Sequence, residues 1–199
     1  NGDAEQCVDA LCGLSADTAE QSAAEVLARN DLIYDPGMLW EAKRTELRRA
    51  GLEMWDAVPD LGGLAGVKDA FEQEVLPWLR DKQLSVKRIL LAGLPGQGKS
   101  FCSRWLAHLL KIPCAFSLDL AGLKAGHVGE SEGNLKRAFA AIRAANKHAP
   151  GVVVLDEIEK LAAEGLDSGV SSGMFKMLLT ELQEDTSLTI YIATLNDLS

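Results

Sequence analysis

The chain has 199 residues and a formal net charge of −9. Hydrophobic residues make up 47% and charged residues 25%, which is typical of a globular protein with a sizeable core and excludes a disordered or fibrous chain. The excess of negative charge argues against a broad surface that binds nucleic acid or anionic lipid. No apolar run approaches the roughly 20 residues of a membrane span, and the N-terminus is acidic, so we expect a cytoplasmic protein.

Residues 1–58 show the spacing and capping signals of helices. Ser15 is placed to cap a helix that runs through Leu27. The pair Asp35-Pro36 is typical of an N-cap followed by a proline at the first helical position, and Gly51 is typical of a C-terminal stop. We therefore predict a small helical segment over residues 1–58, ahead of a second unit.

That second unit, residues 59–199, begins after a break rich in proline and glycine. After a helix that ends near Pro77, apolar runs typical of buried strands alternate with amphipathic helical patterns, one of them capped by Ser131. The expected strands are residues 89–92, 114–118, 152–155 and 188–193, and the expected helices include residues 99–110 and 175–182. This alternation predicts an α/β fold with a mostly parallel sheet covered on both faces, whose ligands bind beyond the carboxyl ends of the strands.

The stretch from Gly93 to Ser100, GLPGQGKS, fits the phosphate-binding loop pattern G-x-x-x-x-G-K-[ST]. A predicted strand precedes it and a predicted helix follows it, as the pattern requires. Its glycines allow backbone N–H groups to form an anion nest, and the helix directs the positive end of its dipole to the same place. Lys99 is then expected to contact the β- and γ-phosphates and Ser100 to help hold Mg²⁺. The alternative is a glycine-rich turn that matches by chance.

Two carboxylates follow the predicted strand at residues 152–155. Asp156 is placed to hold Mg²⁺ together with Ser100, and Glu157 is placed to accept a proton from an attacking water molecule. Taken alone, the pair could equally mark a strand that runs into an acidic loop. Downstream of a phosphate-binding loop, it predicts a catalytic pair.

The last predicted strand leads to Asn196, whose amide could reach the γ-phosphate and the attacking water. An isolated asparagine at this place is more typical of a turn. Its order after the other two signals favours a role in the site.

With these motifs in order, the chain from about Pro59 onward resembles an AAA+ ATPase. Residues 60–64 and 67–68 resemble the first segment of the AAA module, residues 129–139 the stretch between the Walker motifs, and residues 156–160 and 193–196 the Walker B region and sensor 1. The resemblance implies a three-layer αβα P-loop NTPase, the large AAA+ subdomain, with ATP and Mg²⁺ as cofactors. It also implies a homo-oligomeric ring that remodels a protein partner by ATP hydrolysis.

The resemblance assigns a role to each site residue. Glu157, Lys99 and Asn196 would be catalytic, and Ser100 and Asp156 would hold the metal. The nucleotide would be bound by Leu61 and Gly62, whose backbone would lie near the adenine, and by Leu94, Pro95, Gly96, Gln97, Gly98, Lys99, Ser100 and Phe101.

A narrower resemblance is to the AAA ATPases encoded as a hypothetical reading frame in algal plastid genomes and found in cyanobacteria and other bacteria. The likeness is carried by residues 169–172, Phe175 and residues 178–184, and by residues 11–15 and 48–52 ahead of the AAA module. The chain departs from threading members of the family at His127, where they have a pore-loop aromatic residue. This departure favours an alternative function, a nucleotide-dependent switch or scaffold with little turnover.

The chain begins at Asn1 and ends at Ser199, just after sensor 1. By the resemblance, the arginine finger, the helical lid and the sensor 2 arginine would follow Ser199, so we expect the chain to be part of a longer protein. Residues 1–199 alone should hydrolyse ATP slowly or not at all, because an arginine that clamps the γ-phosphate in trans contributes a factor of roughly 10³ to 10⁵.

Overall fold

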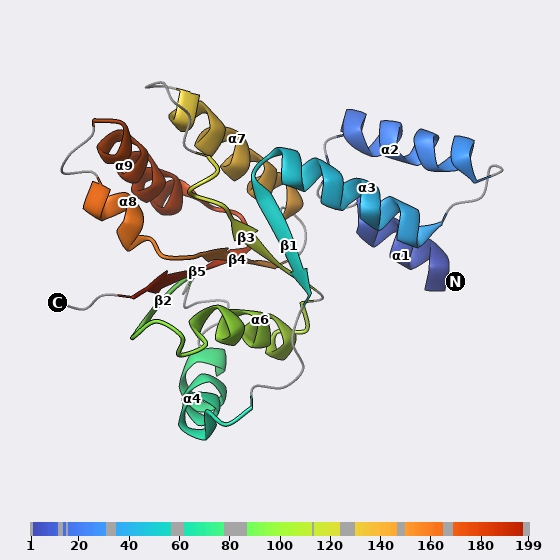
Figure 1. The fold of residues 1–199 in the computed structure, drawn as a ribbon. Coiled ribbons are helices and arrows are strands. Elements are labelled where there is room, and N and C mark those ends of the chain that lie inside the picture. The colour runs from blue at the N-terminus through green and yellow to red at the C-terminus, as the bar shows by residue number, and fades with distance from the viewer. Residues whose placement is uncertain are drawn as a thin grey trace.

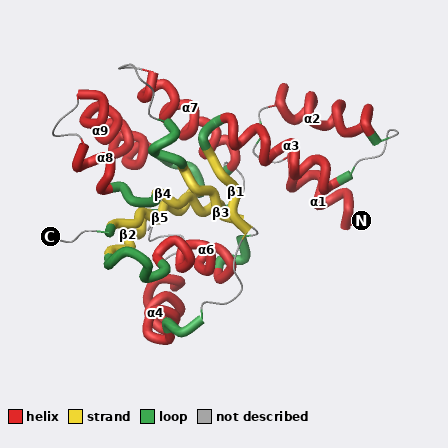
Figure 2. The backbone as a smooth tube through the Cα atoms, in the orientation of Figure 1, coloured by secondary structure: helices red, strands yellow, loops and turns green. Residues whose placement is uncertain are grey.

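The computed structural model describes residues 2–11, 14, 16–30, 35–56, 62–77, 87–112, 114–123, 130–146, 150–164 and 169–196. Within these residues the chain forms one five-stranded sheet with helices on both faces and a group of helices beside it (Figures 1 and 2). No helix in the described ranges has both the length and the apolar character needed to cross a membrane.

The sheet has the strand order β1-β3-β4-β5-β2. Its strands are β1 (Leu52–Asp56), β2 (Arg88–Ala92), β3 (Cys114–Leu118), β4 (Gly151–Leu155) and β5 (Thr189–Leu195). The pairs β2–β5, β3–β4 and β4–β5 are parallel, whereas β1 pairs antiparallel with β3. The predicted mostly parallel sheet is therefore confirmed, and the carboxyl ends of its four parallel strands lie at one edge.

Two apolar cores cover the two faces of the sheet. On one face, Val153 and Leu155 pack with Phe139 beneath α7 (Glu130–Ala145), α8 (Glu159–Glu164) and α9 (Gly169–Glu184). On the other face, Val152 and Val154 pack with Trp105 of α6 (Lys99–Leu109). Successive strand residues point to opposite faces, so a strand that is apolar throughout supplies both cores. The predicted three-layer α/β fold is confirmed (Figure 1).

The face covered by α6 also carries the helix predicted to end near Pro77. It begins as α4 (Ala65–Ala70) and continues as the π-helix η1 (Phe71–Val75). Phe71 is buried and makes an edge-to-face contact with Trp105, with 6.1 Å between the ring centroids. This contact attaches α4 and η1 to α6, the helix that follows the phosphate-binding loop.

The helical reading of residues 1–58 is wrong for Leu52–Asp56, which form β1. Met54 packs against the core under α7 and Trp55 against the core around α6, so this short strand contributes to both faces. The prediction for Ser131 is also corrected. Because α7 begins at Glu130, Ser131 lies inside the helix and is fully buried, and it is not the N-cap residue.

The N-terminal helices α1 (Gly2–Leu11), α2 (Ala16–Arg29) and α3 (Pro36–Arg49) lie beside β1 and have a small core of their own (Figure 1). The predicted cap of α3 is confirmed, because the Asp35 carboxylate accepts hydrogen bonds from the backbone N–H groups of Gly37 and Met38 at 2.7 and 3.2 Å. Ser15 lies outside the described residues. At its other end, α3 places Leu47 in the core under α7, so this helix connects the two groups. The boundary between residues 58 and 59 stays a prediction.

Gly51 makes the turn from α3 into β1 and confirms the predicted helix stop. Its φ of +82° lies in the left-handed region, and a Cβ atom there would lie 2.6 Å from Cδ2 of the buried Leu123. We expect Gly51→Ala to lower the free energy of unfolding by about 2–4 kcal/mol, which combines backbone strain and overpacking. Urea denaturation followed by circular dichroism measures this loss.

Gly63 is the matched control for Gly51. Its φ is +85°, but within the part of the chain that the structure describes no atom beyond its chain neighbours lies within 4 Å of the position of a Cβ. Gly63→Ala should therefore show only the backbone term, about 1–2 kcal/mol. Equal losses in the two variants would contradict the packing contribution of Leu123.

Candidate active site

The predicted phosphate-binding loop connects β2 to α6 at the carboxyl edge of the sheet. The N–H of Gly93 donates to the carbonyl of Leu195 at 3.1 Å, which extends the β2–β5 pairing into the loop. Gly96 and Gly98 have φ values of +78° and +80°, and apart from their chain neighbours no atom of the described residues lies within 4 Å of the position of a Cβ on either. The backbone of the loop therefore turns sharply and meets open space at both glycines.

A cleft of about 360 Å³ lies against this loop. It collects residues from the loop, from the start of α6, and from the ends of β4 and β5. Its lining residues are Pro95, Gly96, Gly98, Lys99, Ser100, Phe101, Asp156, Glu157, Thr194 and Asn196. The ends of β4 and β5 follow the loop by about 60 and 100 residues in the chain, yet all three segments meet at one edge of the sheet. Ligand sites in open α/β folds usually lie at such an edge.

Lys99 begins α6 and folds back over the loop. Its ammonium group donates to the carbonyls of Gly93 and Leu94, each at 2.9 Å. The cation is thus held at the loop, beside the N-terminus of an 11-residue helix. Both features favour an anion at this end of the cleft.

Ser100 and Asp156 are hydrogen-bonded to each other, although they are 56 positions apart in the sequence. The Ser100 hydroxyl donates to the Asp156 carboxylate, with distances of 2.8 and 3.0 Å to its two oxygens. Thr194 on β5 donates to the same carboxylate at 2.8 Å. A hydroxyl and a carboxylate side by side are oxygen ligands of the kind that Mg²⁺ prefers.

Glu157 follows Asp156 with a φ of +54°, an uncommon conformation for a residue with a side chain. Its backbone N–H donates to the Thr194 hydroxyl at 2.9 Å, which fixes the turn after β4. Its carboxylate accepts a hydrogen bond from the Asn196 amide at 2.8 Å and also contacts the ammonium of Lys160. The catalytic candidates Glu157 and Asn196 are therefore in direct contact.

The charges around Glu157 favour its ionised form. The contact with the Lys160 ammonium lowers the pKa of Glu157 below its ordinary value, and partial burial opposes this shift. The hydrogen bond from Asn196 and the positive charge of Lys99 lower the pKa further. Glu157 is therefore a carboxylate at neutral pH, the form that can accept a proton.

Some of the predicted nucleotide-binding residues do not line the cleft. Leu94 has 67% of its surface exposed, and neither Leu94 nor Gln97 lines it, although both belong to the loop. Gly62 is exposed and lies just before α4. Leu61 and His127 lie outside the described residues. The binding roles of all these residues stay predictions.

Thr194 is the site residue that was not singled out from the sequence. It is fully buried, and its hydroxyl connects the Asp156 side chain to the Glu157 backbone. A signal was present, because Thr194 lies near the end of β5, two positions before Asn196, which follows the strand directly, and alternate residues of an extended segment point to the same side. A polar residue in an apolar strand, two positions before the predicted site residue, points to the same edge.

The residues of the cleft fit a magnesium nucleotide by their chemistry. The open glycine backbone, the Lys99 ammonium and the start of α6 suit phosphate groups, while the Ser100 hydroxyl and the Asp156 carboxylate suit a divalent cation. Mg²⁺ is commonly bound by one or two protein ligands and by phosphates of the substrate.

Comparison with known proteins agrees with this geometry. Two uncharacterized AAA domain-containing ycf46 proteins match almost the whole chain: the one from Trieres chinensis is 26% identical over 97% of it, and the one from Guillardia theta 25% identical over 96%. They confirm the predicted narrower resemblance. The peroxisomal ATPase PEX6 of Neurospora crassa is 32% identical over 64% of the chain. The chain spans 41%, 40% and 9% of these three proteins, respectively.

Among solved structures, the FIGL-1 AAA domain in complex with ADP matches with a TM-score of 0.56 and 24% identity. The match covers 76% of this chain and 53% of that one, and it supports the fold. The model of one family, described as the ATPase family associated with various cellular activities (AAA), matches residues 89–199, which include the phosphate-binding loop and the whole cleft. The chain therefore belongs to the AAA family of ATPases.

Proposed function

We propose that this chain binds ATP with Mg²⁺ in the cleft at the carboxyl edge of the sheet and hydrolyses it. One observation carries the proposal: the cleft brings together Lys99, the Ser100–Asp156 pair and the Glu157–Asn196 pair. These are the groups that bind phosphates, hold a magnesium ion and activate water. A glycine-rich turn that matches the loop pattern by chance would not account for the two pairs.

Each residue has a defined part in this proposal. Lys99 and the loop backbone would bind the β- and γ-phosphates, and the backbone of Leu61 and Gly62 would contact the adenine. Ser100 and Asp156 would hold Mg²⁺, which would neutralise part of the charge on the phosphates. Glu157 accepts a proton from water, and Asn196 orients the Glu157 carboxylate and the water.

The full-length protein is proposed to work as a homo-oligomeric ring in the cytoplasm and to remodel a protein partner. Family membership supports this part of the proposal, because AAA ATPases commonly act as rings. Residues 1–199 alone are expected to be slow or inactive for want of a charge clamp from a neighbouring subunit.

A second candidate is a nucleotide-dependent switch with little turnover, which His127 favours because it stands at the pore-loop position of an aromatic residue. An unfolded polypeptide distinguishes the two functions. It should stimulate ATP hydrolysis by a remodelling ring and should leave a switch unchanged.

The test of hydrolysis is phosphate release from ATP by the full-length protein at high protein concentration. Turnover above the background of a Lys99→Ala variant is the expected result. If the wild-type protein releases no more phosphate than this variant, the proposed function fails.

A further inference from the structure

Glu157 lies in the wall between two cavities. One is the nucleotide cleft, which Glu157 lines together with Asn196. The other, with a volume of about 270 Å³, lies towards β1 and is lined by Glu53, Asp119, Asp156, Glu157 and Lys160, among others. We call it the outer cavity. The Glu157 carboxylate therefore borders both spaces.

The two carboxylate oxygens of Glu157 have different partners. Oε1 accepts the hydrogen bond from Asn196, whereas Oε2 contacts the ammonium of Lys160. Lys160 lines the outer cavity and is not among the residues that line the nucleotide cleft. Its cation therefore attracts the carboxylate from the side of the outer cavity.

The local backbone holds Lys160 in this place. The N–H of Lys160 donates to the carbonyl of Glu157 at 3.0 Å, in the turn that starts α8. Residues three apart in such a turn lie side by side, so the ammonium needs no change of backbone to contact the carboxylate. The left-handed φ of Glu157 belongs to the same turn.

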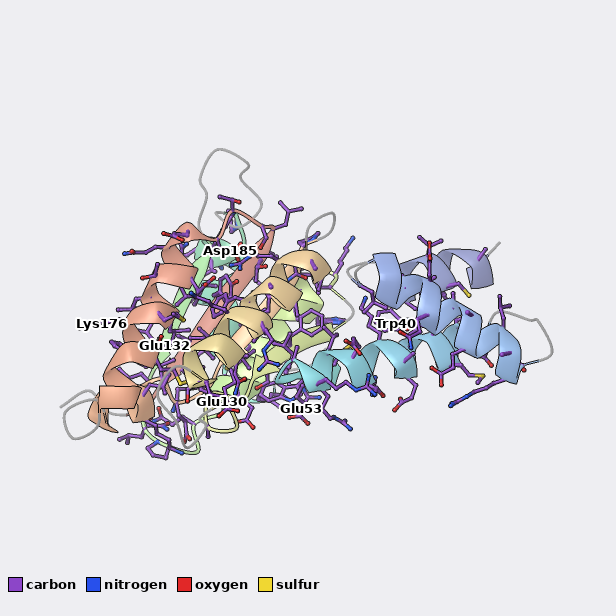
Figure 3. All side chains as sticks on the ribbon, turned by 90° about the horizontal axis from the view of Figure 1, so that it is seen from above. Trp40, Glu53, Glu130, Glu132, Lys176 and Asp185 are labelled. Atoms are coloured by element: carbon purple, nitrogen blue, oxygen red, sulfur yellow. The ribbon has the colours of Figure 1, made fainter. Side chains whose placement is uncertain are left out.

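The contact can also be broken easily. The Lys160 side chain is 65% exposed, and exposed ion pairs are weak. Two further carboxylates, Glu53 of β1 and Asp119 after β3, line the same cavity and offer the ammonium other acidic neighbours (Glu53 is labelled in Figure 3). Release of Glu157 would therefore leave Lys160 near negative charge.

We propose that Lys160 is a positioning residue that restrains Glu157: its ammonium holds one carboxylate oxygen at the outer cavity and so limits the access of Glu157 to the attacking water. This inference rests on the proposed hydrolysis of ATP. A carboxylate acts as a base only when an oxygen reaches the water that it deprotonates. Breaking the ion pair should therefore speed the chemical step without changing nucleotide binding.

The test compares steady-state ATP hydrolysis by the full-length protein and its variants. Lys160→Met keeps the length of the side chain and removes the cation. It should raise kcat about two- to five-fold, the range expected from an exposed ion pair, and leave KM for ATP unchanged. Lys160→Arg, which restores a cation, should bring kcat back towards the wild-type value. Lys176→Met on the exposed face of α9 is the control and should behave as wild type (Figure 3).

Several results would overturn the inference. A kcat for Lys160→Met at or below the wild-type value would do so, as would equal changes in kcat and KM. A merely structural role for Lys160 would lower activity and would not give a selective rise in kcat.

Crystal structures of wild-type protein and of Lys160→Met distinguish a failure of this inference from a failure of the proposed function. Wild-type protein should show the contact between Lys160 and Glu157, and Lys160→Met should show the Glu157 carboxylate turned away from the outer cavity. Absence of the contact in wild type, or an unmoved carboxylate in the variant, overturns the inference whatever the turnover. Lack of turnover in wild type with the predicted contact present would instead defeat the proposed function.

Discussion

Replacing Lys99 by alanine is expected to weaken binding of ATP to the full-length protein by at least about 100-fold. The ammonium group lies at the phosphate-binding loop, within 2.9 Å of the carbonyls of Gly93 and Leu94, at the end of the cleft where we expect the phosphates. A charged hydrogen bond contributes about 1.5–3 kcal/mol, and a phosphate accepts more than one. Isothermal titration calorimetry with ATP and Mg²⁺ measures the loss.

The control for Lys99→Ala is Lys136→Ala, which removes an exposed lysine from α7. This variant should bind ATP as tightly as wild type, because Lys136 does not line the cleft. Wild-type affinity in Lys99→Ala would show that the phosphates bind elsewhere.

Replacing Glu157 by glutamine is expected to reduce kcat for ATP hydrolysis by roughly 10² to 10⁴ and to leave the affinity for ATP close to wild type. Glutamine has the same shape, and its amide oxygen can still accept the hydrogen bond from Asn196. It cannot take a proton from water, so binding is kept and chemistry is lost. Single-turnover hydrolysis and calorimetry on the same preparation measure the two effects separately.

Glu184→Gln, at the exposed C-terminal end of α9, is the matched substitution outside the cleft and should hydrolyse ATP at the wild-type rate. A Glu157→Gln variant that hydrolyses normally would exclude Glu157 as the base. Loss of ATP binding in that variant would point to a structural role for the side chain.

The parts of the fold that could be predicted from the sequence are those with a local signal. The glycine-rich loop lies directly before α6, which begins at Lys99, as the loop pattern predicts. The apolar run of β4 ends at Leu155, directly before Asp156, as predicted. The cap at Asp35 and the stop at Gly51 also depend on neighbouring residues alone. Parallel strands end at one edge of a sheet, so the order of the motifs was enough to predict that they meet.

The parts that could not be predicted depend on contacts between distant residues or on an uncommon backbone conformation. The five residues of β1 follow a helix closely and do not alternate cleanly, since Met54 and Trp55 are both apolar. They become a strand because β3, some 60 residues later, offers an edge for antiparallel pairing. The contact between Lys160 and Glu157 depends on the turn into α8, a helix that was not predicted, and on the left-handed backbone of Glu157.

The exposed surface of β2 shows the same dependence on position in the sheet. After Arg88 its residues are all apolar, like those of β4, yet 57% of the surface of Leu90 is exposed, whereas every residue of β4 is buried. The difference follows the sheet order, in which β2 lies at an end and β4 in the middle. Hydrophobic pattern predicted that β2 is a strand. The pattern could not predict how far each of its residues is covered.

The most direct test of the ATP site is a crystal structure of the full-length Glu157→Gln variant with ATP and Mg²⁺, in which slow hydrolysis should preserve the nucleotide. The expected result has the γ-phosphate in the cleft in contact with the Lys99 ammonium, and Mg²⁺ held between the phosphates and the side chains of Ser100 and Asp156. A nucleotide bound away from the loop at Gly93 to Ser100, or a magnesium ion that approaches neither Ser100 nor Asp156, would contradict the proposed site.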